Sequence, residues 1–186
     1  MLSTWELFRD EIDRNISPNI EMIEQQLLFL VERNICNQAD FSKITKVRLM
    51  ASHEQAISEY LHNRGIYRQA SLKAETVFLA STIEYLLEKL LNFYVATGIV
   101  AQGDFDNIFP KYPMFTTFSK LIKSIQYFPD FPDDLKKDID ELRDERNKVH
   151  IDAYCLDNTR LFHEEFKVVK FRKVFDGFIS YIKEHT

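Results

Sequence analysis

One short stretch of the chain, residues 143–150, combines side chains that could perform chemistry together. Its polar residues recur at i, i+3, i+4 and i+7, a spacing that an α-helix brings onto one face. They are Arg143, Arg146, Asn147 and His150. At a helical rise of about 1.5 Å per residue, Arg146 lies roughly 6 Å and Arg143 roughly 10 Å from His150 along the axis. One phosphate, or two adjacent phosphates of a nucleic acid, could therefore touch all of them.

This set of side chains suits the cleavage of RNA by its own 2′-hydroxyl, without a metal ion. The reaction needs a group of near-neutral pKa to move protons, and we assign this role to His150. It also needs donors for the charge that grows on the phosphate, which Arg143 and Arg146 would supply as a clamp. Asn147 would orient the substrate or the imidazole. The ordinary alternative is a solvated helix face that ends in a structural histidine.

The same stretch resembles the motif of the HEPN superfamily, a group of all-α domains. Its nuclease members carry an Arg, four to six intervening residues and a His, often with an Asn directly after an Arg. Six residues separate Arg143 from His150, whereas three separate Arg146, the arginine that Asn147 follows, from the same histidine. Arg146 is thus one residue short of the family spacing, and both arginines remain candidates for the family's Arg.

The resemblance implies a helical-bundle homodimer in which two motifs face each other across a cleft that admits RNA. It also implies a toxin or an effector of antiviral defence, such as abortive infection, with a cognate antitoxin or regulatory protein as a further partner. Some members of the superfamily have kept the fold but are no longer nucleases. They imply an alternative for this chain, a catalytically inactive helical module for protein interaction. Where a nucleotidyltransferase controls a member, a modifiable Tyr follows the motif His by two residues; here that position is Asp152, so we expect no such regulation.

The composition is that of an ordinary globular chain. Its 186 residues, 45% hydrophobic and 28% charged, suffice for one domain with a full core, so we expect residues 1–186 to form a single domain. Four glycines and five prolines are few for this length, which favours helices over a turn-rich β fold. A net charge of −5 argues against a protein coated with nucleic acid, although a small cleft can still bind RNA through its local field.

Cysteine usage and hydropathy predict a cytoplasmic protein. Cys36 and Cys155 form no CxxC pair, as is usual in a reducing compartment. Residues 1–10 lack the basic and apolar regions of a signal peptide. The most apolar segment, residues 77–100, is interrupted by charged residues such as Glu84, which would be costly in lipid. We therefore expect no membrane contact.

No pattern for a cofactor or a metal is present. The chain has no GxxxxGK[ST], GxGxxG or GxSxG sequence, so a phosphate loop or a nucleophile elbow is not expected. The five histidines form no HExxH, and neither cysteine lies at ligand spacing from the other. We expect neither a cofactor nor a metal ion.

Apolar periodicity predicts an all-α fold, an up-and-down bundle of about five to seven helices. The expected helices span residues 4–16, 20–34, 44–63, 72–93, 113–125, 130–150 and 162–184. The fourth of them has the strongest apolar seam and should be the central buried helix. Residues 36–43 and 98–113 are expected to be loops, and Asp130 is expected to cap the motif helix.

Glu84 lies within the apolar surround of the expected central helix. The position has two interpretations. The one we favour places the carboxylate on an exposed edge of that helix. In the other, Glu84 faces an arginine and helps to hold the candidate site.

Two further groups of residues could touch RNA but have an ordinary explanation. Aromatic residues gather at Phe105, Phe109, Tyr112, Phe115, Phe118, Tyr127, Phe128 and Phe131. Bases stack on exposed rings, yet such a cluster is more typical of a core or a homodimer contact, which we expect here. The last helix is locally basic at Lys167, Lys170, Arg172 and Lys173. We expect a solvated face there, with a strip that guides RNA as the alternative.

Overall fold

The computed structural model describes residues 10, 14, 20–63, 69–110, 117–152 and 165–186. Within these ranges, residues 69, 149–152, 165 and 166 are described by their backbone alone. Helices make up every regular element of the described chain, and no strand occurs in it. The expected all-α class is therefore confirmed.

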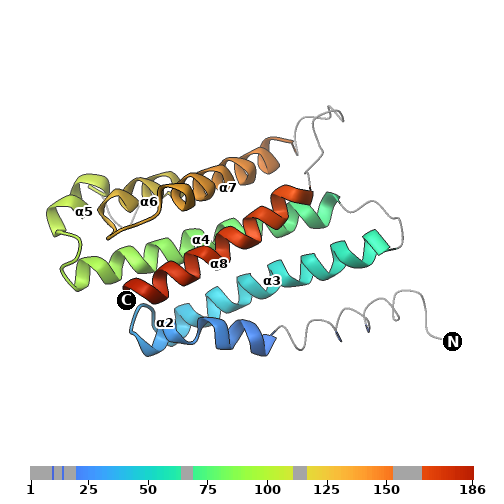
Figure 1. Ribbon diagram of the computed structural model, residues 1–186, viewed down its shortest axis with the longest axis horizontal. Helices are drawn as coiled ribbons and strands as arrows, with labels where there is room; N and C mark the ends of the chain where they lie inside the picture. Colours follow the sequence, from blue (N-terminus) through green and yellow to red (C-terminus); the bar gives the residue numbers. More distant parts are fainter. Residues whose placement is uncertain (1–9, 11–13, 15–19, 64–68, 111–116, 153–164) are drawn as a thin grey trace.

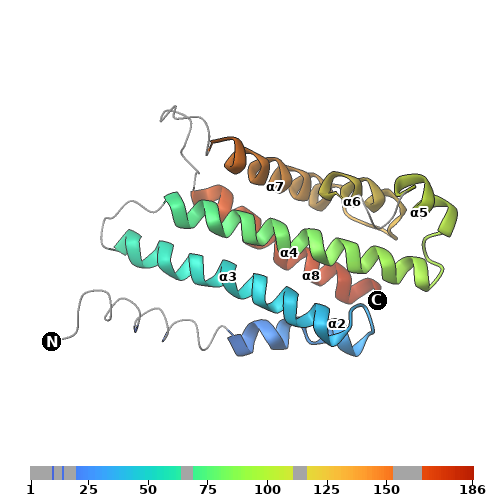
Figure 2. The same cartoon turned by 180° about the vertical axis from the view of Figure 1, so that it is seen from behind.

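The helices follow one another in an up-and-down order. In chain order they are residues 20–27, α2 (Phe29–Glu32), α3 (Gln38–Asn63), α4 (Gln69–Ala96), α5 (Gln102–Ile108), α6 (Phe118–Ser124), the 3-10 turn η1 (Ile125–Tyr127), α7 (Asp133–Asp152) and α8 (Glu165–His185). The four long helices α3, α4, α7 and α8 alternate in direction along the bundle (Figure 1). Both views place α2 and α3 on one side and α5, α6 and α7 on the other (Figures 1 and 2).

Helix α4 is the centre of the bundle, as its apolar seam predicts. It packs against α3, α6, α7 and α8. The predicted seam is buried at Leu72, Thr76, Leu79, Ile83, Leu86 and Leu90. Since those side chains recur every three or four residues, a straight helix presents them all to its neighbours. The C-terminal end of α8 is bound to the residue that follows α2, because Arg33 Nη1 donates to the carbonyl oxygen of Lys183 at 2.6 Å.

Several boundaries differ from those expected. Residues 38–43 belong to α3 and not to a loop, because the Asn37 side chain accepts a hydrogen bond from the Asp40 amide at 2.9 Å and caps the helix start. Part of the expected loop at 98–113 forms α5, whose Phe105 and the following Phe109 are buried four residues apart. Tertiary burial of these rings supports a helix that the polar composition of the segment did not indicate.

The motif helix begins later than expected. Helix α7 starts at Asp133, with Asp133 and Asp134 in its first turn, where carboxylates favour the positive end of the helix dipole. Asp130 is not its cap, because its φ of 47° places it in the left-handed region of a preceding turn. Most of the expected helix at 4–16, and the expected helix start at Pro113, lie outside the described residues.

The aromatic cluster is part of the core wherever the structure describes it. Phe105, Phe109, Phe118 and Phe128 are buried, and Tyr127 and Phe131 pack against that core. Tyr112 and Phe115 lie outside the described residues. The expectation of a core role is confirmed for the described rings. None of the described helices has an apolar stretch of the length that a membrane span requires.

Candidate functional site

Helix α7 divides its side chains between the core and the candidate site. Ile139 and Leu142 are fully buried. Arg143 and Arg146 lie beside this apolar side, with side chains that are 22% and 25% exposed. Both arginines are therefore partly shielded from water, which lowers the effective dielectric around their charges.

Three of the four predicted site residues line one pocket. This pocket, called the site pocket below, has a volume of about 540 Å³. Its lining residues are Glu84, Thr117, Phe118, Ser119, Arg143, Arg146 and Asn147. His150 belongs to α7 by its backbone, one turn after Arg146, and its side chain lies outside the described part.

Helix α6 brings residues to the site pocket that the sequence did not reveal. Thr117 caps α6 by accepting a hydrogen bond from the Lys120 amide at 3.4 Å. The helix therefore begins at Phe118, and its first turn, with Ser119, faces the motif face of α7. Neither the spacing of these residues nor their types distinguish them from an ordinary helix start. Only the packing of α6 on α7 places them at the pocket.

Glu84 faces the candidate site, which is the alternative that we did not favour from the sequence. Its Oε2 atom accepts a hydrogen bond from Arg146 Nη1 at 2.6 Å, and its side chain is 26% exposed. The feature of the sequence that pointed to this role was a carboxylate in an otherwise apolar stretch of α4. The expectation of an exposed edge was wrong because α7 packs on α4 and its Arg146 pairs with Glu84.

The Arg146 guanidinium is held from two sides but keeps donors for a ligand. Its Cζ atom lies 5.9 Å from the centre of the Phe118 ring, within the range of a cation–π contact. A guanidinium has five N–H donors. Within the described residues, the hydrogen bond from Nη1 to Glu84 is the only one that Arg146 donates. The fork is therefore oriented at the pocket, and its other donors form no hydrogen bond to the described residues.

Arg143 is paired with carboxylates of its own helix. Its Nη1 atom lies 2.8 Å from Asp140 Oδ1, an ion pair without a well-aligned hydrogen bond. Its Nη2 and Nε atoms donate to Asp144 Oδ1 at 2.7 and 3.2 Å. Pairs of this kind between partly exposed groups on one helix contribute only about 0–1 kcal/mol. An anionic ligand can therefore compete for the Arg143 guanidinium at little cost.

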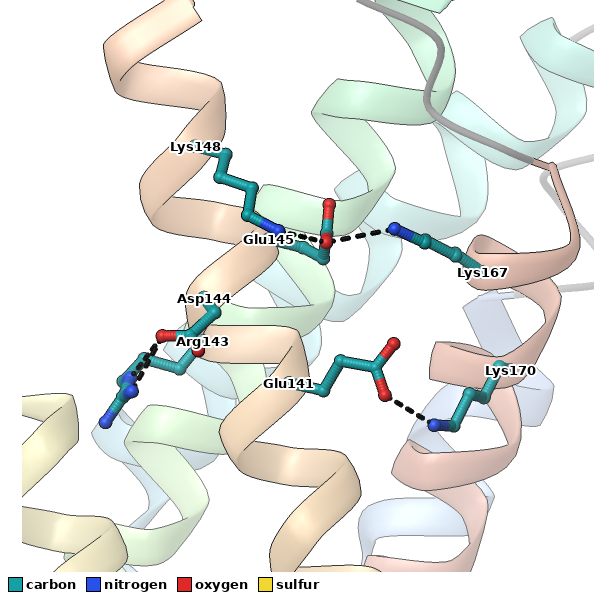
Figure 3. A network of polar contacts seen from close by, with 7 residues as sticks. All are labelled: Glu141, Arg143, Asp144, Glu145, Lys148, Lys167 and Lys170. Carbon is teal, nitrogen blue, oxygen red and sulfur yellow. Dashed lines mark hydrogen bonds and ion pairs between the residues drawn. The ribbon is translucent and has the colours of Figure 1, made fainter. Parts of the chain in front are cut away.

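A ladder of ion pairs joins α7 to α8 beside the motif (Figure 3). Lys148 Nζ donates to Glu145 Oε1 at 2.7 Å, and Lys167 Nζ donates to the same oxygen at 3.1 Å. One turn earlier, Lys170 Nζ lies 2.6 Å from Glu141 Oε2. These contacts fix the part of α7 that carries Arg143 and Arg146 against α8.

The same contacts explain the basic stretch of α8. Lys167 and Lys170 are engaged by carboxylates of α7. Arg172 donates to both oxygens of the buried Glu75 on α4, at 2.6 and 2.8 Å. Only Lys173 of this group is exposed. Neither a wholly solvated face nor an open RNA strip describes these residues, because three of the four hold α8 to its neighbours.

We expect Glu145→Gln to lower the free energy of unfolding by about 1–3 kcal/mol at pH 7. Burial opposes ionisation of Glu145, but the hydrogen bonds and charges of Lys148 and Lys167 outweigh it, and the pKa of the carboxyl falls below its ordinary value of 4.5. A lowered pKa stabilises the fold above pH 4.5, and this stabilisation is lost as the pH falls through the folded-state pKa.

Urea unfolding of the wild type and of Glu145→Gln between pH 7 and pH 3 measures this effect. The two free energies should converge at the acid end of the range. Glu184→Gln, at an exposed position near the end of α8, is the control and should behave as the wild type. A difference that stays constant down to pH 3 would contradict the assigned ionisation.

The site pocket thus presents two guanidinium groups and an amide, with one carboxylate in its lining. Planar guanidinium donors match the geometry of phosphate oxygens, so a phosphate is the ligand that this lining fits best. Among the described residues, no three His, Cys, Asp or Glu side chains could hold a metal ion together. No family model, curated protein or solved structure matches the chain significantly.

Proposed function

We propose that this protein is a metal-independent endoribonuclease of the HEPN type. The observation that carries the proposal is the site pocket, where Arg143, Arg146 and Asn147 of the motif helix line one cavity. A phosphate in this cavity would meet donors whose positions are set by Glu84 and by the packing of α7. Preorganised donors of this kind stabilise the charge that develops on a phosphate during displacement.

The reaction follows from the nucleophile that RNA itself carries. The 2′-oxygen bonds to the adjacent phosphorus while the bond from phosphorus to the 5′-oxygen breaks. His150 moves protons, since an imidazole has the near-neutral pKa that this task needs. Arg143 and Arg146 bind the phosphate oxygens, and Asn147 orients the substrate or the imidazole. The products are a 2′,3′-cyclic phosphate and a free 5′-hydroxyl.

The biological role that we propose is that of a cytoplasmic toxin or antiviral defence effector. In this role the chain acts as a homodimer whose two motifs share one RNA cleft, and a cognate antitoxin or regulatory protein restrains it. The proposal rests on the resemblance of residues 143–150 to the HEPN motif. Growth arrest on expression in a bacterial host is the expected phenotype.

The alternative, an inactive module that binds a protein through its aromatic residues, has less support. That interpretation needs rings on the surface. Phe105, Phe109, Phe118 and Phe128 are instead buried within this chain. The charged lining of the site pocket also fits a phosphate better than it fits an apolar partner.

Purified protein should cut single-stranded RNA in the presence of EDTA. The new ends should carry a 2′,3′-cyclic phosphate. Acid, or a phosphatase that opens the cyclic phosphate, should then change the electrophoretic mobility of the RNA fragments. DNA of the same sequence is the matched control and should stay intact, because it lacks the 2′-hydroxyl. Intact RNA at enzyme in excess, or cleavage that EDTA abolishes, would overturn the proposal.

A further inference from the structure

A second pocket adjoins the site pocket and is rich in lysine. It has a volume of about 560 Å³ and lies between α6 and the first half of α7. We call it the basic pocket, after Lys120, Lys123, Lys136 and Arg143, which line it. Each of the two pockets has the size of cavities that hold small organic ligands.

The basic pocket concentrates positive charge on a chain whose net charge is −5. Four cations line it, with Asp140 as the one carboxylate among its lining residues. That carboxylate is already paired with Arg143 at 2.8 Å. In the described part of the chain, the ammonium groups of Lys120, Lys123 and Lys136 form no ion pair with a carboxylate. Such a cluster raises the local concentration of an anionic ligand.

The two pockets are neighbours, because they share lining residues. Ser119 and Arg143 line both of them. Lys120 and Lys123 are three residues apart on α6, about 4.5 Å along the axis, and Lys136 lies about 10 Å from Arg143 along α7. A chain of phosphates that leaves the site pocket past Arg143 would therefore meet these lysines in turn.

We propose that the basic pocket binds the phosphates of RNA nucleotides next to the cleaved link. This inference rests on the proposed ribonuclease function and assigns it an extended single strand as substrate. Lysine ammonium groups act as point charges and carry little sequence information. No aromatic ring is among the described residues that line the basic pocket. Binding through this pocket is thus tolerant of sequence and sensitive to salt. A strand, rather than a single nucleotide, is the preferred substrate.

Binding of an uncleavable probe tests the inference directly. The probe is a fluorescent single-stranded RNA with 2′-O-methyl groups throughout, measured by anisotropy over a range of salt concentrations. The variant Lys120→Ala/Lys123→Ala/Lys136→Ala should bind it at least about tenfold more weakly. Its slope of log affinity against log salt should be flatter by about 2, from a contribution of roughly 0.7 per lost phosphate contact on a single strand.

A matched control removes the same charge elsewhere. Lys46→Ala/Lys137→Ala/Lys173→Ala changes three exposed lysines outside both pockets. It should bind the probe like the wild type. Lys123→Glu, a single change at an exposed position, should also weaken binding of the probe. This variant replaces the triple variant in the test if the triple variant does not fold. Unchanged affinity and salt slope in both basic-pocket variants would overturn the inference, as would an equal loss in the control.

A cleavage assay separates this inference from the ribonuclease proposal. With a long RNA the triple variant should show a raised KM, whereas with a dinucleotide, which cannot reach the basic pocket, its kcat/KM should equal that of the wild type. If no RNA is cleaved but the probe still binds in a lysine-dependent manner, the basic pocket stands and the ribonuclease proposal fails. Equal loss on both substrates would overturn the basic pocket alone.

Discussion

The His150→Ala variant should cleave RNA about 10²–10⁴ times more slowly than the wild type at pH 7. The proposed reaction moves one proton from the 2′-hydroxyl and one to the leaving 5′-oxygen, and the imidazole is the only group of the motif with a suitable pKa. Initial rates on a single-stranded RNA measure the loss. In the wild type, kcat/KM should also depend on pH near the pKa of a histidine, and this dependence should vanish in the variant.

The control for this variant is His62→Ala, which removes an exposed imidazole in the last turn of α3. It should cleave RNA like the wild type. Expression in cells gives an independent readout: the wild type and His62→Ala should arrest growth, and His150→Ala should relieve the arrest. Equal growth with all three chains, together with intact RNA in vitro, would favour the inactive interaction module.

The Arg146→Ala variant is expected to lose about 10²–10³-fold in kcat/KM. The variant lacks the guanidinium donors that stabilise the charge of the transition state, so its kcat should fall more than its KM rises. Lys137→Ala, an exposed cation of the same helix outside both pockets, is the matched control and should be unaffected. A change in KM alone would mean that Arg146 binds the substrate and the transition state equally.

Glu84 should act through Arg146, and a double-mutant cycle can show it. The 2.6 Å hydrogen bond orients the guanidinium, and a misplaced group can cost up to about 10²-fold in rate. We therefore expect Glu84→Gln to reduce kcat/KM, but less than Arg146→Ala does. Once Arg146 is absent, Glu84→Gln should have no further effect, because the two side chains act as one unit. Additive losses, or faster cleavage by Glu84→Gln alone, would contradict the positioning role.

Folding controls separate these effects from instability. Glu84 and Arg146 are each about one quarter exposed, so the loss of their pair should cost only about 0–1 kcal/mol in the free energy of unfolding. Thermal melts of the variants should therefore lie close to that of the wild type. A large drop in stability on removing either side chain would show that the pair is mainly structural.

Much of the fold could be predicted from local sequence periodicity. Apolar residues every three or four positions indicated α4 as the central helix, and the observed burial of Leu79, Ile83 and Leu86 confirms it. The same geometry placed Arg143, Arg146 and Asn147 on one face of α7. Such features depend only on the 3.6-residue period of a single helix, and a short stretch of sequence is enough to show that period. The chemical role of His150 stays a prediction of this kind.

Helix boundaries were less predictable, because single contacts shift them. Residues 36–43 are mostly polar, which suggested a loop, yet a side-chain cap at Asn37 starts α3 within them. Helix α5 exists in a segment marked by Gly and Asp because Phe105, and Phe109 directly after the helix, are buried against the bundle. In both cases the residues responsible can be seen in the sequence, but the contacts that they form in the folded chain cannot.

By itself, the amino-acid sequence determined that this chain is helical and which side chains share the face of the motif helix. Only the tertiary structure decided what meets that face. Glu84 and Arg146 are 62 residues apart in the chain, and Lys167 and Lys170 of α8 proved to be paired with carboxylates of α7. The lysines of α6 became part of a pocket for the same reason. Contacts between helices depend on how their surfaces pack, and no local repeat encodes that packing.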